Sequence, residues 1–393
     1  MEKIEKEGAR AFPLLAGLIF MLAATLGVCR GGAEAAIGLV GAMLLYVAAS
    51  LAEGRFLKPQ RGILLFCGAF LGSIALLDFQ AAFPVFSAHD TLQLASILLP
   101  LALLSSPALL ARLAALKIWR FWPWILVGGL LAAACAMGFL RLAGNEGLLT
   151  KYNRGASYGF LFAWPAAAML WRERRQKDGG RRFVFFLIAI LPALFLTHSR
   201  AAQTGLCFGL LMAAFAACAP VWAPRLGGII ALLSVLWPFG AQAFFRDAPD
   251  LVAKLPDSWR ARVEIWDYLS YRVLEKPFLG WGIGCSYKLP FAEPDGSRYI
   301  FTTFPAAHPH NMFVQLWVEL GIPGALFGLA MLFLSLRAMA RLSADLRAFA
   351  FGAWAYALVL LLSAYDFWTD SLICSLALCA ALFAVLRLQK LEN

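Results

Sequence analysis

Apolar residues in this chain fall in blocks of about twenty, and this pattern limits the fold more than any other feature. An α-helix of roughly twenty residues spans the ~30 Å hydrocarbon core of a bilayer. The chain is 62% hydrophobic and only 15% charged, whereas soluble domains carry about a quarter charged residues. We therefore predict an all-α integral membrane protein, with residues 1–393 forming a single polytopic membrane domain.

About twelve transmembrane helices follow from the positions of these blocks. The expected spans are 11–29, 33–52, 62–79, 91–109, 121–140, 156–171, 183–197, 201–219, 226–244, 311–336, 346–364 and 368–386. Only three residues separate the seventh span from the eighth. Fusing or shortening this pair gives an alternative count of eleven.

The positive charges predict the orientation of these spans. If the N-terminus is cytoplasmic, 21 of the 34 Lys and Arg residues lie in cytoplasmic segments, and five lie in the short outer loops. Cytoplasmic loops of membrane proteins carry this excess of positive charge. We therefore expect a multi-pass protein with both termini cytoplasmic. Topology then explains most of the net charge of +11, so we expect no nucleic-acid partner.

The longest polar segment is residues 245–310, which we expect as one large outer loop between the ninth and tenth spans. Within it, residues 257–266 have the pattern of an amphipathic helix, with Asp257 or Ser258 accepting from the first-turn amides. Trp259, Val263 and Trp266 repeat at helical spacing, so they lie on one face of this helix. A face of this kind favours a helix lying in the lipid headgroup layer.

Alternating glycines follow this helix, in the run from Lys276 to Gly284. Glycines permit a tight, closely packed turn because they have no side chain. The run follows no predicted strand and opens no βαβ unit, so we do not interpret it as a nucleotide-binding loop.

His310 stands at the start of the tenth span and is the strongest candidate for chemistry. The four histidines all map to the outer face: His89, His198, His308 and His310. A neutral imidazole can take a proton from a hydroxyl near neutral pH. The competing interpretation of His310 is a neighbour of the helix N-cap with no catalytic role. No carboxylate or thiolate stands at ligand spacing from His308 and His310, so we expect no metal site.

Four outer arginines are candidates for binding phosphate. A guanidinium binds phosphate oxygens through two parallel hydrogen bonds. Arg200 lies in a very short outer turn, and Arg262 is the better candidate of the pair Arg260 and Arg262 on the loop helix. Arg154 enters the sixth span. The alternative is that these side chains anchor helix ends or remain solvated.

Glu319 is a clear charge near the bilayer midplane. It follows His310 by nine residues, which places it about 13 Å along the helix. A carboxylate at this depth is paired or protonated. An interhelical hydrogen bond and a catalytic role are both open for it.

The tenth span resembles a signature of bacterial O-antigen ligases. That signature is a histidine followed by Asn, Ser or Gln, nine residues, Gly, two residues, then Gly, Thr or Tyr. His310, Asn311, Gly321 and Gly324 match it. The run 276–284 is similar to the "P-hydrophobic-hydrophobic-G-x-G-x-G" stretch of the same superfamily. The turn Thr197-His198-Ser199-Arg200 resembles its Ser-Arg turn.

The resemblance implies a metal-independent glycosyltransferase without cofactors in the bacterial inner membrane. Such a ligase moves glycan from undecaprenyl pyrophosphate to a sugar hydroxyl of lipid A–core on the periplasmic face. Its partners would be these two substrates and the surrounding membrane lipids. His310 would be the general base, and the substrate-binding residues would be Arg200, Arg262, Arg260, Arg154 and Asn311.

Other acceptors and one other class of protein stay open. O-antigen polymerases, protein O-oligosaccharyltransferases and other polysaccharide ligases share the same plan of spans and loop. A transporter of lipid-linked glycans is the alternative from a different class. Transporters place charged groups near the midplane and often contain internal repeats, whereas this chain has one clear midplane charge, Glu319, and no convincing repeat.

Overall fold

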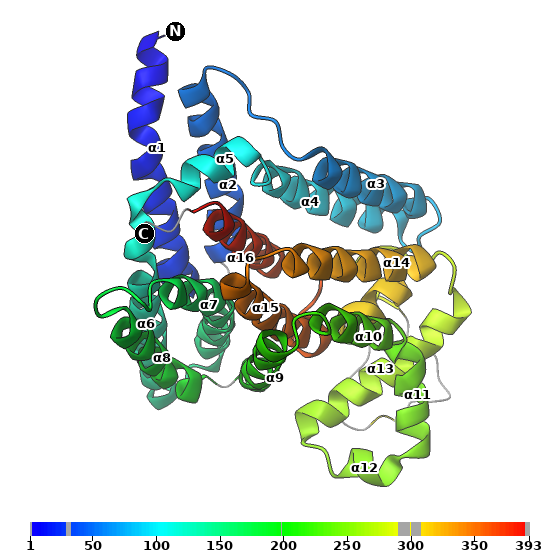
Figure 1. Ribbon diagram of the computed structural model, residues 1–393. Helices are drawn as coiled ribbons and strands as arrows, with labels where there is room; N and C mark the ends of the chain where they lie inside the picture. The colour runs from blue at the N-terminus through cyan, green and yellow to red at the C-terminus, as the bar shows by residue number, and fades with distance from the viewer. Residues whose placement is uncertain (1, 29–32, 198, 290–298, 300–307, 390–393) are drawn as a thin grey trace.

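The computed structural model describes residues 2–28, 33–197, 199–289, 299 and 308–389 (Figure 1). Every regular element in these residues is a helix, which confirms the all-α fold. The helices are α1 (Glu2–Leu22), η1 (Ala23–Gly27), α2 (Ala33–Glu53), α3 (Arg61–Asp78), α4 (Pro84–Leu103), α5 (Pro107–Ala114), η2 (Lys117–Arg120), α6 (Trp122–Leu142), α7 (Glu146–Arg172), α8 (Gly179–Leu196), α9 (Arg200–Cys218), α10 (Ala223–Val235), α11 (Trp237–Asp247), α12 (Pro249–Ala253), α13 (Asp257–Glu275), α14 (Met312–Ala340), α15 (Ala344–Ser363) and α16 (Asp370–Leu388).

This is a multi-pass membrane protein. Within the described residues, nine helices are long and apolar enough to cross a bilayer, and the bent pair α10–α11 would make a tenth. Residues Phe12–Gly27 form a shorter apolar helix. Helix α7 covers the sixth expected span and is buried on all sides between Gly155 and Leu170, as expected of a central helix. Each of the twelve expected spans overlaps a helix, but the count of twelve crossings stays a prediction.

Two expected spans differ from the observed helices at prolines. The fourth span begins earlier, at Pro84, and ends at Leu103, and Pro107 then opens the separate helix α5. The ninth span is divided at Leu236 into α10 and α11, and Pro238 lies in the first turn of α11. Proline lacks the N–H that continues a helix and clashes with the preceding turn. The average apolarity of a span does not predict where a proline interrupts the helix.

Glycines bring α9 and α15 into close contact. A Cβ atom on Gly205 would lie 3.3 Å from the carbonyl oxygen of Tyr356. A Cβ atom on Gly209 would lie 2.9 Å from the carbonyl oxygen of Gly352. Small residues allow this approach between membrane helices. Because the pairing runs in opposite directions along the two helices, the first turn of α9, with Arg200, lies toward the C-terminal end of α15.

Helix α13 starts where the sequence predicts, but its cap differs. Pro256 occupies the N-cap position and no side chain caps the first turn. Asp257 is the first helical residue, and both Asp257 and Ser258 were therefore wrong as caps. An acidic residue in the first turn still stabilises the partial positive charge of the helix N-terminus.

The apolar face of α13 packs against protein. Val263, Trp266 and Val273 are buried in one cluster with residues of α11 and α14, including Val314 and Val318. Trp266 is only 4% exposed, so the prediction that this face lies in the headgroup layer was wrong. An apolar stripe has the same sequence whether lipid or protein covers it. Figure 1 shows α11, α12 and α13 together at one corner of the molecule, beside the start of α14.

Candidate active site

Helix α14 is broken at Gly321, and the glycine-rich segment, residues 276–284, packs on the break. Gly321 has φ 62° and ψ −144°, a conformation that essentially only glycine adopts. A Cβ atom at this position would lie 2.6 Å from the carbonyl carbon of Phe278. The amide of Ile322 donates to the carbonyl of Pro277 at 3.0 Å. The two glycine-containing motifs of the sequence are therefore in direct contact.

The glycine-rich segment also satisfies the carbonyls that the break leaves without helical partners. In a regular helix, the carbonyl of Glu319 would accept from residue 323, but Pro323 has no N–H. The amide of Gly282 donates to Glu319 O at 2.8 Å, and the amide of Trp281 donates to Val318 O at 2.9 Å. Buried backbone groups require such partners. These bonds hold the first half of α14, and hence the histidine that precedes it, in one position.

Asn311 is the N-cap of α14. Its Oδ1 atom accepts from the amides of Phe313 at 3.0 Å and Val314 at 3.2 Å. Its Nδ2 atom donates to the carbonyl of Leu362 at 3.2 Å. The described contacts therefore give Asn311 a positioning role between α14 and α15. Substrate binding by Asn311 stays a prediction.

His310 is held in a single tautomer by its backbone surroundings. Its φ of 56° is uncommon for a residue with a side chain. The ring Nδ1 lies 3.1 Å from the carbonyl oxygen of Ala364. A carbonyl can only accept, so Nδ1 carries the proton and Nε2 keeps a free lone pair. The backbone amide of His310 donates to Nδ1 of His308 at 3.3 Å.

The ring of His310 is neutral at neutral pH. Burial lowers the pKa of His310 to about 3, and the nearby His308 and Arg262 lower this pKa as well. Burial also lowers the pKa of His308. Desolvation and positive neighbours both disfavour the imidazolium form. His310 is therefore in the form that can accept a proton.

The end of α15 collects three of the expected site residues. The carbonyls of residues 362–364 accept, in order, from Asn311 Nδ2 at 3.2 Å, Arg262 Nε at 2.9 Å and His310 Nδ1 at 3.1 Å. The last carbonyls of a helix lack intrahelical partners and carry a partial negative charge. The C-terminus of α15 thus orients an amide, a guanidinium and an imidazole side by side.

Arg262 and Arg260 have different surroundings. Arg262 is half-buried, donates from Nη1 to the carbonyl of Ser258 at 2.6 Å and lies over the ring of Trp259. Burial lowers the pKa of Arg262, and no ion pair to Arg262 occurs among the described residues. Arg260 forms an ion pair with Asp257. The geometry therefore brings Arg262 to His310, whereas Arg260 pairs along its own helix.

Arg154 and Arg200 lie at the same end of the bundle. The guanidinium of Arg154 is 5.6 Å from the ring centroid of Tyr365, and its charge contributes to lowering the pKa of His308. Arg154 therefore belongs to the surroundings of the histidine pair. Arg200 is exposed at the first turn of α9 and donates to Gln203 Oε1 at 3.1 Å. No described contact links Arg200 to His310, and the preceding His198 lies outside the described residues.

Glu319 takes part in an interhelical network. Its side chain is fully buried and accepts from Trp368 Nε1 and from Gln315 Nε2. Gln315 Nε2 also donates to Asp366 Oδ1 at 2.9 Å, and Gln315 Oε1 accepts from the amide of Phe367 at 2.9 Å. The network connects α14 to the segment between α15 and α16. Of the two roles open for Glu319, the contacts favour the interhelical hydrogen bond.

Two groups that position the histidines were not predicted from the sequence. The indole of Trp266 donates to the carbonyl of Pro309 at 2.8 Å, which fixes the residue between the two histidines. The carbonyl of Ala364 selects the tautomer of His310. A buried tryptophan whose N–H needs a partner is a usable signal, but a backbone acceptor has none because any residue supplies it.

Two chemical functions meet in this arrangement. A neutral imidazole with a free Nε2 can remove a proton from a hydroxyl. Guanidinium groups held nearby can stabilise negative charge on a phosphate leaving group. Together they fit transfer of a group from a phosphate-linked donor to a hydroxyl.

The comparisons with known proteins agree with this chemistry. Residues 183–329 match the family model described as O-antigen ligase. This range contains every expected site residue except Arg154, together with both glycine-containing motifs. It therefore covers the part of the chain from α8 to the broken helix α14.

Two curated proteins are similar to this chain, and both bear the name "Putative polysaccharide ligase". The protein from Rickettsia conorii is 23% identical over 240 residues, which are 59% of this chain and 57% of the relative. The protein from Rickettsia felis is 24% identical over 226 residues, which are 56% of this chain and 54% of the relative. The chain thus spans about half the length of the curated relatives that it matches. The resemblance to O-antigen ligases that the sequence signature indicates is confirmed over the segment that contains His310 and Arg262.

Proposed function

We propose that this protein transfers O-antigen glycan from undecaprenyl pyrophosphate to a sugar hydroxyl of lipid A–core. The reaction takes place at the periplasmic face of the bacterial inner membrane, with both termini in the cytoplasm and residues 245–310 as the large periplasmic loop. The family match over residues 183–329 supports this class of reaction. The observation that carries the proposal is the hydrogen bond from His310 Nδ1 to Ala364 O, because it leaves Nε2 as a base beside Arg262.

The chemical step uses residues of this chain alone. His310 Nε2 takes the proton of the acceptor hydroxyl as its oxygen forms a bond to the anomeric carbon of the donor sugar. The bond from that carbon to the pyrophosphate oxygen breaks, and undecaprenyl pyrophosphate leaves with the bonding electrons. Arg262, together with Arg154 and Arg200, holds the pyrophosphate and stabilises its developing charge. The proposed step has no requirement for a metal ion or a nucleotide.

The lipopolysaccharide of a strain lacking this protein tests the proposed acceptor. We expect lipid A–core without O-antigen, while long glycan chains accumulate on the polyprenyl carrier, and restoration by the wild-type gene. A ladder with a single repeat unit on lipid A–core would instead identify a polymerase. An unchanged ladder would contradict the proposal and direct attention to other polysaccharides or to transport.

A further inference from the structure

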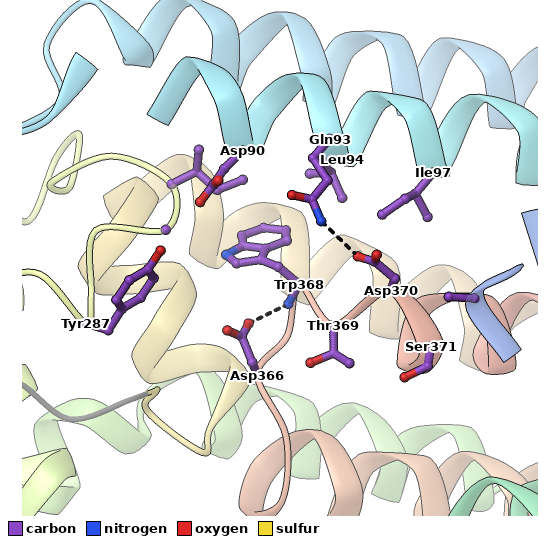
Figure 2. A pocket seen from close by; sticks show the side chains of 13 residues that line it. Asp90, Gln93, Leu94, Ile97, Tyr287, Asp366, Trp368, Thr369, Asp370 and Ser371 are labelled. Carbon is purple, nitrogen blue, oxygen red and sulfur yellow. Dashed lines mark hydrogen bonds between the residues drawn. The ribbon is translucent and has the colours of Figure 1, made fainter. Parts of the chain in front are cut away.

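A cavity of about 440 Å³ has three carboxylates in its lining and shares no lining residue with the cluster of His310, Asn311 and Arg262 (Figure 2). Helix α4, the loop after the glycine-rich segment and the start of α16 contribute to its walls. Its polar lining includes Asp90, Gln93, Tyr287, Asp366, Trp368 and Asp370. The volume falls in the range of small-molecule sites, roughly 300–1,000 Å³. None of these side chains has a role in the step proposed above.

One short segment joins the cavity to the base. The carbonyl of Ala364 accepts from His310, the ring of Tyr365 faces Arg154, and Asp366 lines the cavity. The charge of Asp366 also acts on His308, where it opposes the lowering of the histidine pKa. The segment 364–366 therefore connects the cavity to the histidine pair.

The charge of the cavity is opposite to that of the arginine side of the site. Asp90, Asp366 and Asp370 line it, and no Lys or Arg occurs among its described lining residues. Carboxylates that line a cavity repel a pyrophosphate group inside it, because both groups are negatively charged. The carboxylates accept hydrogen bonds from hydroxyl groups, which sugars carry at high density. The cavity therefore fits the hydroxyl-rich part of a substrate and excludes its anionic part.

Two aromatic rings complete the lining. Figure 2 shows Asp90 and Gln93 reaching from α4 toward the indole of Trp368, with Tyr287 at another wall. Gln93 Nε2 donates to Asp370 Oδ1 at 3.4 Å, which couples α4 to the start of α16. Aromatic faces offer apolar surface to the C–H side of a sugar ring, while the acids and the amide bind its hydroxyls.

The third glycine of the glycine-rich motif belongs to this cavity. Gly284 lines it, with φ of 68°, and a Cβ atom there would lie 1.9 Å from Asp90 Oδ2. The carboxylate of Asp90 therefore lies against the bare backbone of Gly284.

We propose that this cavity is the acceptor subsite, which binds a sugar residue of the acceptor glycan next to the reacting hydroxyl. The inference rests on the proposed function, since a transferase needs two substrates. The arginines take the pyrophosphate of the donor, and the carboxylates disfavour that group in the cavity. The cavity therefore matches an uncharged sugar residue, and the two Michaelis constants distinguish the acceptor glycan from the glycan of the donor.

Two substitutions test the subsite through the two Michaelis constants. Asp370→Asn removes a negative charge and one acceptor oxygen from the cavity, and Gln93→Ala removes the amide. Neither substitution changes a residue of the His310 site. Asp250→Asn, an exposed carboxylate on α12, is the matched control. Initial rates are measured with purified protein against lipid A–core at saturating donor, and against lipid-linked donor at saturating acceptor.

We expect the KM for the acceptor to rise about tenfold or more in at least one cavity variant, the effect of a hydrogen bond to a charged group. The KM for the donor should stay within about twofold, and the control should match wild type. An unchanged acceptor KM in both variants, or a rise confined to the donor KM, would overturn the inference.

Failure of the proposed function has a separate signature. If wild-type protein transfers no glycan between these substrates, the proposed function fails and equilibrium binding of radiolabelled lipid A–core without donor then tests the cavity. Weaker binding to Asp370→Asn than to wild type and to Asp250→Asn supports the subsite. Equal binding to all three proteins, or no binding to wild type, overturns it. Thermal melting of each variant identifies any that does not fold, and the other cavity variant then carries the test.

Discussion

Nδ1 of His310 lies 3.1 Å from the carbonyl oxygen of Ala364, at the end of a helix that also accepts hydrogen bonds from Arg262 and Asn311. This contact determines which nitrogen of the ring is basic. It also explains why the histidine precedes a helix N-cap in the sequence. Asn311 and His310 bind the carbonyls of Leu362 and Ala364 in the same partner helix, so the cap residue helps to position the imidazole.

The transfer rate should not fall near pH 6.5, where an ordinary histidine takes up a proton. Burial and the neighbouring His308 and Arg262 lower the pKa of His310 to about 3, so Nε2 stays unprotonated well below neutral pH. We expect kcat/KM, which reports the free enzyme, to be flat between about pH 5 and pH 7.5. An acid limb with its midpoint near 6.5 would show that the base titrates as an ordinary histidine.

The same shift predicts a loss of stability in acid. The folded pKa of His310 lies below its unfolded value of 6.5, so the unfolded chain takes up the proton first as the pH falls. The stability contribution is present above about pH 6.5 and is lost progressively toward pH 3. Thermal melting should therefore show a larger drop from pH 7 to pH 5 for wild type than for His310→Asn. Equal drops in the two proteins would contradict the shift.

Substitution of the two loop arginines should separate their roles. Arg262→Ala removes a guanidinium beside His310, and we expect a loss of about 10²–10³ in kcat/KM for the donor, typical of a lost transition-state donor. Arg260→Ala removes a side chain that pairs with Asp257 and should cost less than tenfold. Steady-state rates with a lipid-linked donor measure both. A larger loss from Arg260→Ala than from Arg262→Ala would show that Arg260, not Arg262, contacts the donor.

The break in α14 should not tolerate a side chain. Gly321→Ala requires φ of 62° with ψ of −144° and brings Cβ to 2.6 Å from Phe278, so we expect destabilisation by about 1–3 kcal/mol or more. Gly128→Ala is the matched control, because this exposed glycine of α6 has no atom within 4 Å of the added Cβ. Thermal melting in detergent measures both. Equal melting temperatures for Gly321→Ala and wild type would contradict the strain.

Apolar block length predicted where the helices lie, because bilayer thickness fixes the length of a span. It did not predict the division at Leu236, because the break depends on one proline within an apolar run. The amphipathic pattern of residues 257–266 assigned the Trp266 face of α13 to the lipid headgroup layer, because an apolar stripe has the same sequence whether lipid or protein covers it. Burial of Trp266 depends on α11 and α14, which lie elsewhere in the chain.

The sequence identified His310 and Arg262 as candidates through residue type and position. It favoured Arg262 over Arg260 but did not decide which of them contacts the donor, since both lie on one helix within two residues of each other. That choice depends on the carbonyl of Ser363, a backbone atom that no side-chain pattern encodes. The acidic cavity was not predicted either, because its residues come from α4, a loop and α16, which only the fold brings together.

The most direct test of the account is the transfer rate of His310→Ala, measured with purified protein, lipid-linked donor and lipid A–core. We predict a loss of about 10²–10⁴, the contribution typical of general acid–base catalysis, with normal membrane insertion and unchanged binding of the donor. Transfer at the wild-type rate in a correctly inserted His310→Ala protein would contradict the role of His310 as the base.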